Sequence, residues 1–299
     1  MRRGVKQINK ELLQSTFRLA KVTHATGIFI FLDPLKEPFE ELFQKNLKIF
    51  FVTRRSVEEV LSLFPEGTKI PLIHLPKIDM TRMGQIQMAI VLALSKQMIR
   101  LGEKLIFVTG LPETDVLDTV VFIDTAHEAE LLTTQAVDGL TEGVRPDVFQ
   151  QTLNIALELA SRGREGKPVG TIFVLGDEEK VLQLSKQMII NPFKGYTDDE
   201  RNILNPTLRD TIFEFAALDG AFIISHEGLV LSAGRHLGTA GDEDTIPRGL
   251  GSRHIAAAGI TSLTDAVALV ISESTGDLRI FKNGKVLMKI EKPSRLPTR

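Results

Sequence analysis

The stretch GIFIFL, residues 27–32, combines one glycine with five apolar side chains, all of them aromatic or branched. Such a run predicts a strand buried on both faces of a sheet. Similar runs recur along the first 125 residues and alternate with segments of helical periodicity. This alternation indicates a parallel sheet covered by helices on both faces. We predict strands over 27–32, 47–52, 70–75, 104–108 and 116–124, and helices over 8–23, 38–44, 57–64 and 80–101.

The second half of the chain follows a different pattern. An amphipathic helix is predicted over 146–162, because Asp147 lies near its start and Gly163 just past its end. Shorter strands follow, and two pairs of them predict hairpins that turn at residues 226–228 and 283–284. These strands indicate a mixed sheet. We predict helices over 178–187 and 207–217, and strands over 167–175, 220–225, 229–233, 266–272, 278–282 and 285–290.

The length of 299 residues favours two domains. Around residues 125–145 the pattern weakens into Thr, Asp, Gly and Glu, and we predict that residues 126–142 form a linker. The predicted fold class is α/β. It comprises an N-terminal parallel-sheet α/β domain over 1–125 and a C-terminal α/β domain over 143–290, with a central mixed sheet flanked by helices.

Composition excludes several classes of protein. The formal net charge is -2 and no long basic run occurs, which disfavours a nucleic-acid polymer as partner. The absence of cysteine excludes disulfides and thiolate nucleophiles. A signal peptide has an apolar core behind its basic start, and this N-terminus has none. The apolar stretches are also shorter than the roughly 18 residues needed to cross a bilayer. We therefore expect a cytoplasmic protein that does not enter a membrane.

Three segments carry the polar chemistry of the second half. In the first, Asp219 is followed by Gly220 and Ala221, which places an acid at a strand edge where the backbone is open to a ligand. A helix C-terminus with a turn glycine is the alternative interpretation. In the third, Ser272 and Glu273 end an apolar strand, where side chains often face a crevice but also form ordinary turns.

The second segment is GLGSRHIAAAGIT, residues 249–261. Gly251, Ser252, Arg253 and His254 precede an Ala-rich stretch that is typical of the first turns of a helix. Backbone N–H groups at a helix start, together with a hydroxyl and a guanidinium, bind phosphate well. The segment is not a Walker A loop, because the lysine after the last glycine is missing. A glycine-rich loop with a solvated arginine is the alternative. Together the three segments suit nucleotide phosphate chemistry.

The second half resembles the diadenylate cyclase (DAC) domain family. The similarity runs over residues 143–290 in five ordered segments, and the added domain in front resembles the archaeal branch, whose N-terminal part is similar to the C-terminal domain of pyruvate kinase. The segments are GREGKPVGTIFVLGD at 163–177, NPFKGY at 191–196, LDGAF at 218–222, GLGSRHIAAAGIT at 249–261 and VISESTGDL at 270–278.

This resemblance implies that two ATP molecules are joined into cyclic di-AMP with release of two pyrophosphates and with help from a divalent metal, Mn²⁺ or Mg²⁺. It implies that Asp219 lies by the ribose 3′-hydroxyl and the metal, and that Arg253 and His254 handle phosphates. The family has arginine where this chain has Ile255, and a second glutamate where it has Ser274. The expected catalytic residues are Asp219, Arg253 and His254. The expected nucleotide contacts are Gly220, Ala221, Leu237 as an adenine wall, Gly251, Ser252, Arg253, His254, Ser272 and Glu273.

The product implied by the resemblance has two-fold symmetry, and each ATP is both attacker and target. Two identical domains face to face are the simplest arrangement that achieves this, so we expect a homo-oligomer with at least a dimer of catalytic domains. A non-catalytic protein that senses ATP or cyclic di-AMP is the alternative, favoured by Ile255 and Ser274. A third interpretation makes the first domain a regulatory or assembly module.

Overall fold

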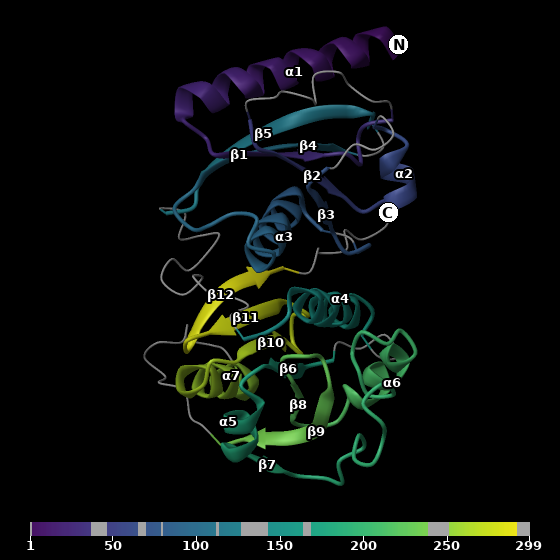
Figure 1. The fold of residues 1–299 in the computed structure, drawn as a ribbon, viewed down its shortest axis with the longest axis vertical. Coiled ribbons are helices and arrows are strands. Elements are labelled where there is room, and N and C mark those ends of the chain that lie inside the picture. The colour runs from purple at the N-terminus through teal and green to yellow at the C-terminus, as the bar shows by residue number, and fades with distance from the viewer. Residues whose placement is uncertain are drawn as a thin grey trace. The chain divides into compact units, whose positions relative to one another are not determined.

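A computed structural model describes residues 2–36, 47–64, 70–78, 80–111, 114–126, 143–163, 169–238 and 251–291. The helix predicted over 38–44 and residues 127–142 of the predicted linker lie outside this part. The chain divides into two compact units, residues 1–77 with 81–128 and residues 78–80 with 129–299 (Figure 1). Within the described residues, no helix has both the length and the apolarity needed to span a bilayer.

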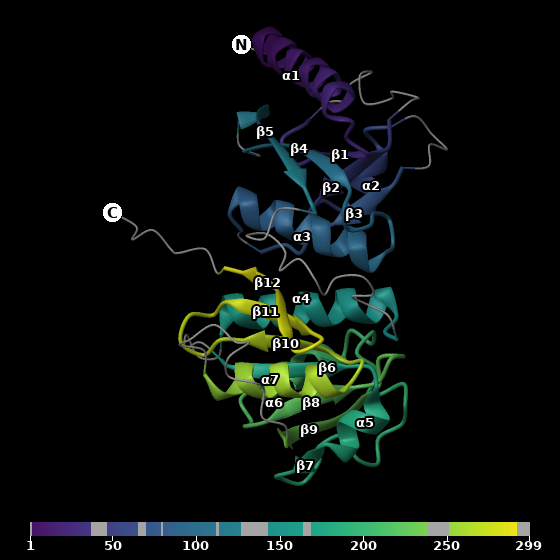
Figure 2. The ribbon, with the colours of Figure 1, turned by 90° about the vertical axis from the view of Figure 1, so that its left-hand side faces the viewer.

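The first unit is built on a five-stranded sheet in the order β3-β2-β1-β4-β5. Figures 1 and 2 show α1 on one side of this sheet and α3 on the other. Phe29 on β1 packs against the rings of Phe50 and Phe107 on the neighbouring strands, while Leu13 and Phe17 of α1 belong to a separate apolar cluster on the other face. The elements are α1 (Arg2–Thr23), β1 (Gly27–Phe31), β2 (Ile49–Thr53), α2 (Val57–Leu61), β3 (Leu72–His74), α3 (Arg82–Ser95), β4 (Lys104–Leu111) and β5 (Val116–Asp124).

The parallel sheet predicted for this unit is correct for β1 to β4 and wrong for β5. Strand β5 runs antiparallel to β4, with Lys104 opposite Asp124 and Leu111 opposite Val116. The reason is the short connection from Leu111 to Val116, because a parallel crossover needs a dozen or more residues. Only Leu117 and Ile123 of β5 are buried, which fits a strand at the edge of the sheet.

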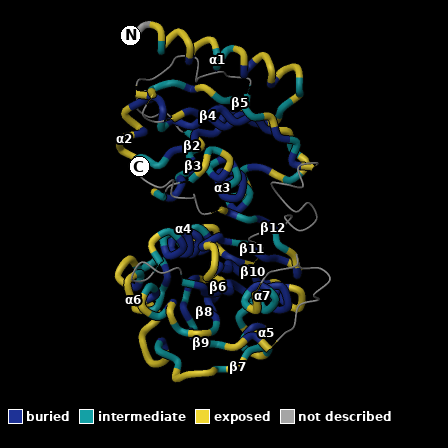
Figure 3. The backbone as a smooth tube through the Cα atoms, turned by 180° about the vertical axis from the view of Figure 1, so that it is seen from behind, coloured by how far each residue is buried: buried dark blue, intermediate teal, exposed yellow. Residues whose placement is uncertain are grey.

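The second unit contains a seven-stranded mixed sheet in the order β12-β11-β10-β6-β8-β9-β7, as the sequence indicated. Both predicted hairpins are present, β8 with β9 and β11 with β12. Its strands are largely buried (Figure 3). The elements are α4 (Pro146–Arg162), β6 (Thr171–Leu175), α5 (Glu178–Gln183), β7 (Ser185–Gln187), α6 (Leu208–Phe215), β8 (Ala221–Ile224), β9 (Val230–Leu237), α7 (Ser252–Leu263), β10 (Val267–Ile271), β11 (Leu278–Lys282) and β12 (Lys285–Ile290).

Two predictions for this unit are wrong in detail. The helix predicted over 178–187 ends at Gln183, and Ser185–Gln187 instead form the edge strand β7, paired with the end of β9. Strand β9 runs to Leu237 rather than to residue 233. Both errors have one cause: Gly234 has a φ of +68°, so the strand continues through a conformation that glycine adopts easily, and its extension provides the partner for β7.

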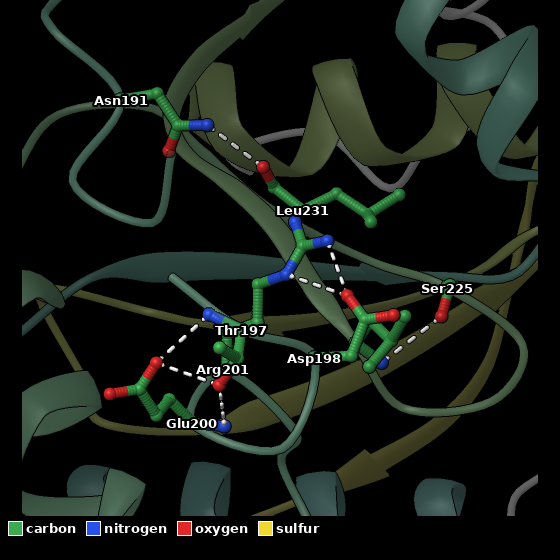
Figure 4. A network of polar contacts seen from close by, with 8 residues as sticks. Asn191, Thr197, Asp198, Glu200, Arg201, Ser225 and Leu231 are labelled. Atoms are coloured by element: carbon green, nitrogen blue, oxygen red, sulfur yellow. Dashed lines mark hydrogen bonds and ion pairs between the residues drawn. The ribbon is translucent and has the colours of Figure 1, made fainter. Parts of the chain in front are cut away.

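The segment between β7 and α6 runs alongside β9 and forms no helix or strand of its own. Asn191 donates from Nδ2 to the carbonyl of Leu231 at 2.8 Å (Figure 4). The N–H of Val230 donates to the carbonyl of Arg201 at 2.8 Å. Arg201 also forms an ion pair with Asp198 at 2.6 Å. These contacts satisfy backbone groups of an otherwise irregular segment and fix it beside the sheet.

Candidate active site

The three segments that the sequence singled out meet at one edge of the seven-stranded sheet, where its strands begin or end. Strands β6 and β8 are parallel and begin at this edge, whereas β9 and β10 are antiparallel to them and end there. Asp219 and Gly220 precede β8, and Ser272 and Glu273 follow β10. Helix α7 begins with Ser252 and packs along the same sheet. Segments up to 54 positions apart in sequence therefore meet at one site.

The guanidinium of Arg253 joins two of these segments. Its Nη1 donates to Oε2 of Glu273 at 2.7 Å, and its Nη2 lies 3.7 Å from Oδ1 of Asp219. The Arg253 side chain is 29% exposed and that of Asp219 is 85% exposed, so the cation is partly sheltered while the carboxylate remains open to a ligand. The arrangement places one cation and one accessible acid side by side at the start of a helix.

Gly220 is required where it lies. Its φ of +104° is unfavourable for any other residue, and a Cβ there would come within 2.7 Å of the backbone N of Arg235 on β9. The N–H of Gly220 donates to Oδ1 of Asp219 at 3.0 Å. Ala221 follows as the buried first residue of β8. The glycine thus lets β9 approach closely and holds the neighbouring carboxylate in a fixed orientation.

Gly170 is a site residue that the sequence analysis missed. It lies just before β6, and a Cβ there would be 2.7 Å from Nη1 of Arg253 and 2.8 Å from Cβ of Glu273. Any side chain would displace the ion pair between those two residues. The available signal was an isolated glycine within a strand-like run, which often marks a close approach of other groups.

His254 faces away from this open edge. It is 5% exposed, its ring centroid lies 6.1 Å from that of Phe281, and its Nε2 is 3.2 Å from Nη1 of Arg279. Burial, together with the nearby guanidinium groups of Arg279 and Arg253, lowers the pKa of His254 to about 4. Successive helix residues point in directions about 100° apart, which is why Arg253 reaches the site and its neighbour does not.

Three other predicted contacts are placed as follows. Leu237 ends β9, is 4% exposed and packs in an apolar cluster with residues of α7. Ser272 is 7% exposed, and its hydroxyl lies 3.2 Å from that of Ser274. Ile255, at the position where the resemblance implies arginine, is partly buried and packs against the same apolar cluster. Contacts of Leu237 and Ser272 with a nucleotide stay predictions.

A divalent metal fits this site only together with a ligand. Among the described residues, no group of three or more His, Cys, Asp or Glu side chains could hold a metal ion. Asp219 is the more exposed carboxylate, at 85%, whereas Glu273 is 66% exposed and lies closer to Arg253. Mg²⁺ and similar cations are commonly bound by one or two carboxylates and completed by substrate phosphates and water. The residues present fit that mode.

Comparisons with known proteins match both halves of the chain. The family model described as "DisA bacterial checkpoint controller nucleotide-binding" matches residues 158–286, and the model "Probable sensor domain DacZ_P" matches residues 9–133. A protein of Methanocaldococcus jannaschii named diadenylate cyclase is 35% identical over 283 residues, which cover 94% of this chain and 87% of that protein. The chain belongs to the diadenylate cyclase family. Both units of this family member are therefore matched, each by its own model.

Other similar proteins cover less of the chain. The diadenylate cyclase of Haloferax volcanii is 42% identical over 149 residues, or 49% of this cyclase-family chain and 53% of the relative. A crystal structure of DacA from Staphylococcus aureus, a double mutant, is 26% identical with a TM-score of 0.36, and covers 48% of this chain and 87% of that one.

Proposed function

We propose that this chain condenses two ATP molecules into cyclic di-AMP and releases two pyrophosphates. The observation that carries this function is the cluster of Asp219, Arg253 and Glu273 at the start of α7, with the acid exposed and the cation beside it. The named activity of the relative that covers 94% of the chain supports the same reaction. We assign catalysis to residues 143–290, in line with the match over 158–286.

Each residue of the cluster has a role in this reaction. A ribose 3′-hydroxyl is a poor nucleophile at neutral pH, so its proton needs an acceptor, and the carboxylate of Asp219 is the accessible base. The α-phosphate of the second ATP carries negative charge that Arg253 can bind. Gly251 caps α7 without a side chain, which leaves the first N–H groups of the helix available to phosphate oxygens.

A bound divalent metal, Mn²⁺ or Mg²⁺, would be held by Asp219 and by ATP phosphates and would neutralise charge on the departing pyrophosphate. Holding both ATP molecules in line then supplies the effective concentration that free ATP lacks. Since ATP is a cytoplasmic metabolite, the cytoplasm stays the predicted location.

A pair of catalytic domains is part of the proposed mechanism. Met188, Ile189 and Ile190 form an apolar patch in which Ile190 is 94% exposed. The patch adjoins the site at Gly234. A Cβ added to Gly234 would lie 2.6 Å from Cγ1 of Ile189 and 3.6 Å from the carbonyl oxygen of Asp219. A second copy that covers this patch would place its own ATP near Asp219, as a two-fold symmetric product requires.

Substitution of Asp219 by asparagine tests the catalytic role directly. Asparagine keeps the shape and the acceptor for the Gly220 N–H but loses the charge, so ATP affinity should survive while turnover falls about 10²- to 10⁴-fold. Asp265→Asn is a matched control, because Asp265 is 84% exposed and precedes β10 at the opposite edge of the sheet. Near-normal turnover in Asp219→Asn, measured as initial rates of product formation, would remove Asp219 from catalysis.

A sensor of ATP or cyclic di-AMP is the second candidate function. It is favoured by Ile255, a partly buried apolar residue at the position where the resemblance implies arginine. Binding of either nucleotide without any turnover would distinguish it from the cyclase. We further propose that the first unit senses a signal, since the model that matches residues 9–133 describes a probable sensor domain. Its likeness to the C-terminal domain of pyruvate kinase stays a prediction.

A further inference from the structure

Arg279 on β11 contacts His254 in the first turn of α7. Its Nη1 lies 3.2 Å from Nε2 of His254, and its side chain is 13% exposed. A guanidinium has donors but no acceptor, so the ring nitrogen that it contacts must accept the hydrogen bond. In this arrangement the imidazole of His254 is neutral and its proton is on Nδ1, a buried atom with no hydrogen-bond partner among the described residues.

The surroundings of His254 keep that state over a wide pH range. The charged groups that act on it are Arg253 on its own helix, Arg279 on β11 and Asp277 just before β11. The pKa of His254 is lowered to about 4; burial is the largest cause, the two arginines add to it, and Asp277 opposes the shift. At neutral pH the ring is therefore uncharged and carries no positive charge to a phosphate.

The other side of Arg279 connects to the turn that carries Glu273. Nη2 of Arg279 lies 3.8 Å from Oδ2 of Asp277, which also lies 3.4 Å from Nζ of Lys289. The carbonyl of Asp277 accepts a hydrogen bond from the N–H of Ser272 at 2.9 Å, which closes the turn around Glu273. The first turn of α7 is thus tied twice to one segment, by Arg253 to Glu273 and by His254 to Arg279.

We propose that Arg279 is a positioning residue of the nucleotide site: it holds neutral His254 against β11 and so orients the first turn of α7, which presents Arg253 to the phosphates. This role rests on the proposed cyclase function. Within it, His254 acts through its neighbours rather than on the reacting atoms. The sequence analysis missed both Arg279 and Asp277. The available signal was that charged residues occur in and next to an otherwise apolar strand, DLRIFK.

Arg279→Met in the full chain is the test. Methionine has similar length and fills the buried space but cannot donate, and Asp277 keeps Lys289 as a partner. We expect the catalytic efficiency kcat/KM for ATP to fall about tenfold to a hundredfold, as loss of one hydrogen bond of a charged group implies, and ATP affinity to weaken with it. Lys289→Met is the matched control: it removes the opposite end of the same network, leaves Arg279 in place and should keep both values.

A spectroscopic readout separates this role from cyclase activity. In wild-type protein labelled with ¹⁵N at histidine, the signal that disappears in His254→Gln should show a proton on Nδ1 and stay unchanged from pH 8 to pH 5.5. In Arg279→Met it should lose that fixed tautomer. A wild-type His254 ring that is protonated on Nε2, or that titrates near pH 6.5, would contradict the proposed hydrogen bond from Arg279. Unchanged kcat/KM and ATP affinity in Arg279→Met would contradict the positioning role. If the wild type makes no cyclic di-AMP, the tautomer and the ATP affinity still decide the role of Arg279.

Discussion

Gly170→Ala should reduce catalysis far more than it reduces stability. The new Cβ would lie 2.7 Å from Nη1 of Arg253, 2.8 Å from Cβ of Glu273 and 3.1 Å from the backbone N of Glu273. Non-bonded heavy atoms prefer separations of about 3.5 Å or more, so the guanidinium must move by about 0.8 Å. A displacement of about 1 Å at a reacting centre can cost about a hundredfold in rate, whereas overpacking costs about 1–3 kcal/mol of folding free energy.

The assay compares initial rates of cyclic di-AMP formation over a range of ATP concentrations with urea unfolding of the same preparations. We expect kcat/KM to fall about a hundredfold while the protein still unfolds cooperatively, because a domain stability of about 5–15 kcal/mol exceeds the expected loss. Gly4→Ala is the control, since a Cβ at that glycine would meet nothing within 4 Å. Wild-type kcat/KM in Gly170→Ala would refute the inference that Arg253 must keep its present position.

Two further predictions concern assembly and pH. Ile190→Lys places a charge on the most exposed residue of the apolar patch, so it should weaken both self-association, measured by light scattering, and activity. Leu263→Lys, at a 58% exposed residue at the end of α7, should change neither. Full activity of a monomeric Ile190→Lys variant would contradict the paired site. The folded-state pKa of His254 is lowered from 6.5 to about 4, so the neutral ring stabilises the fold above pH 6.5, and this contribution, about 3 kcal/mol, is lost as pH falls from 6.5 towards 4. Urea unfolding at pH 7.5 and pH 5 should show a larger loss for wild type than for His254→Gln, and equal losses would argue against a buried neutral histidine.

The sequence predicted the fold class because buried strands have a strong local signature. The run 27–32 became β1 almost unchanged, and the run 104–108 forms the first five residues of β4. The direction of β5 could have been inferred from the short connection after Leu111, since connection length limits the pairing. The end of α5 and the strand β7 could not, because Ser185–Gln187 pair only with the extension of β9 beyond Gly234, a tertiary contact.

For the site, the sequence identified segments but not orientations. Asp219, Arg253 and Glu273 were predicted from their residue types and the structure brings them together. Nothing local showed that His254 points into the unit while Arg253 points out of it, because that depends on how α7 is rotated against the sheet. Gly170 likewise matters only through what lies opposite it.

The most direct measurement is mass spectrometry of the products after purified full-length protein is incubated with ATP and Mn²⁺, and separately with Mg²⁺. If the protein is a diadenylate cyclase, we expect a peak of cyclic di-AMP, with two pyrophosphates released per molecule of product. The peak should remain in Asp265→Asn and disappear in Asp219→Asn. ATP recovered unchanged with both metals, from protein that still binds the nucleotide, would contradict the cyclase function and leave a nucleotide sensor.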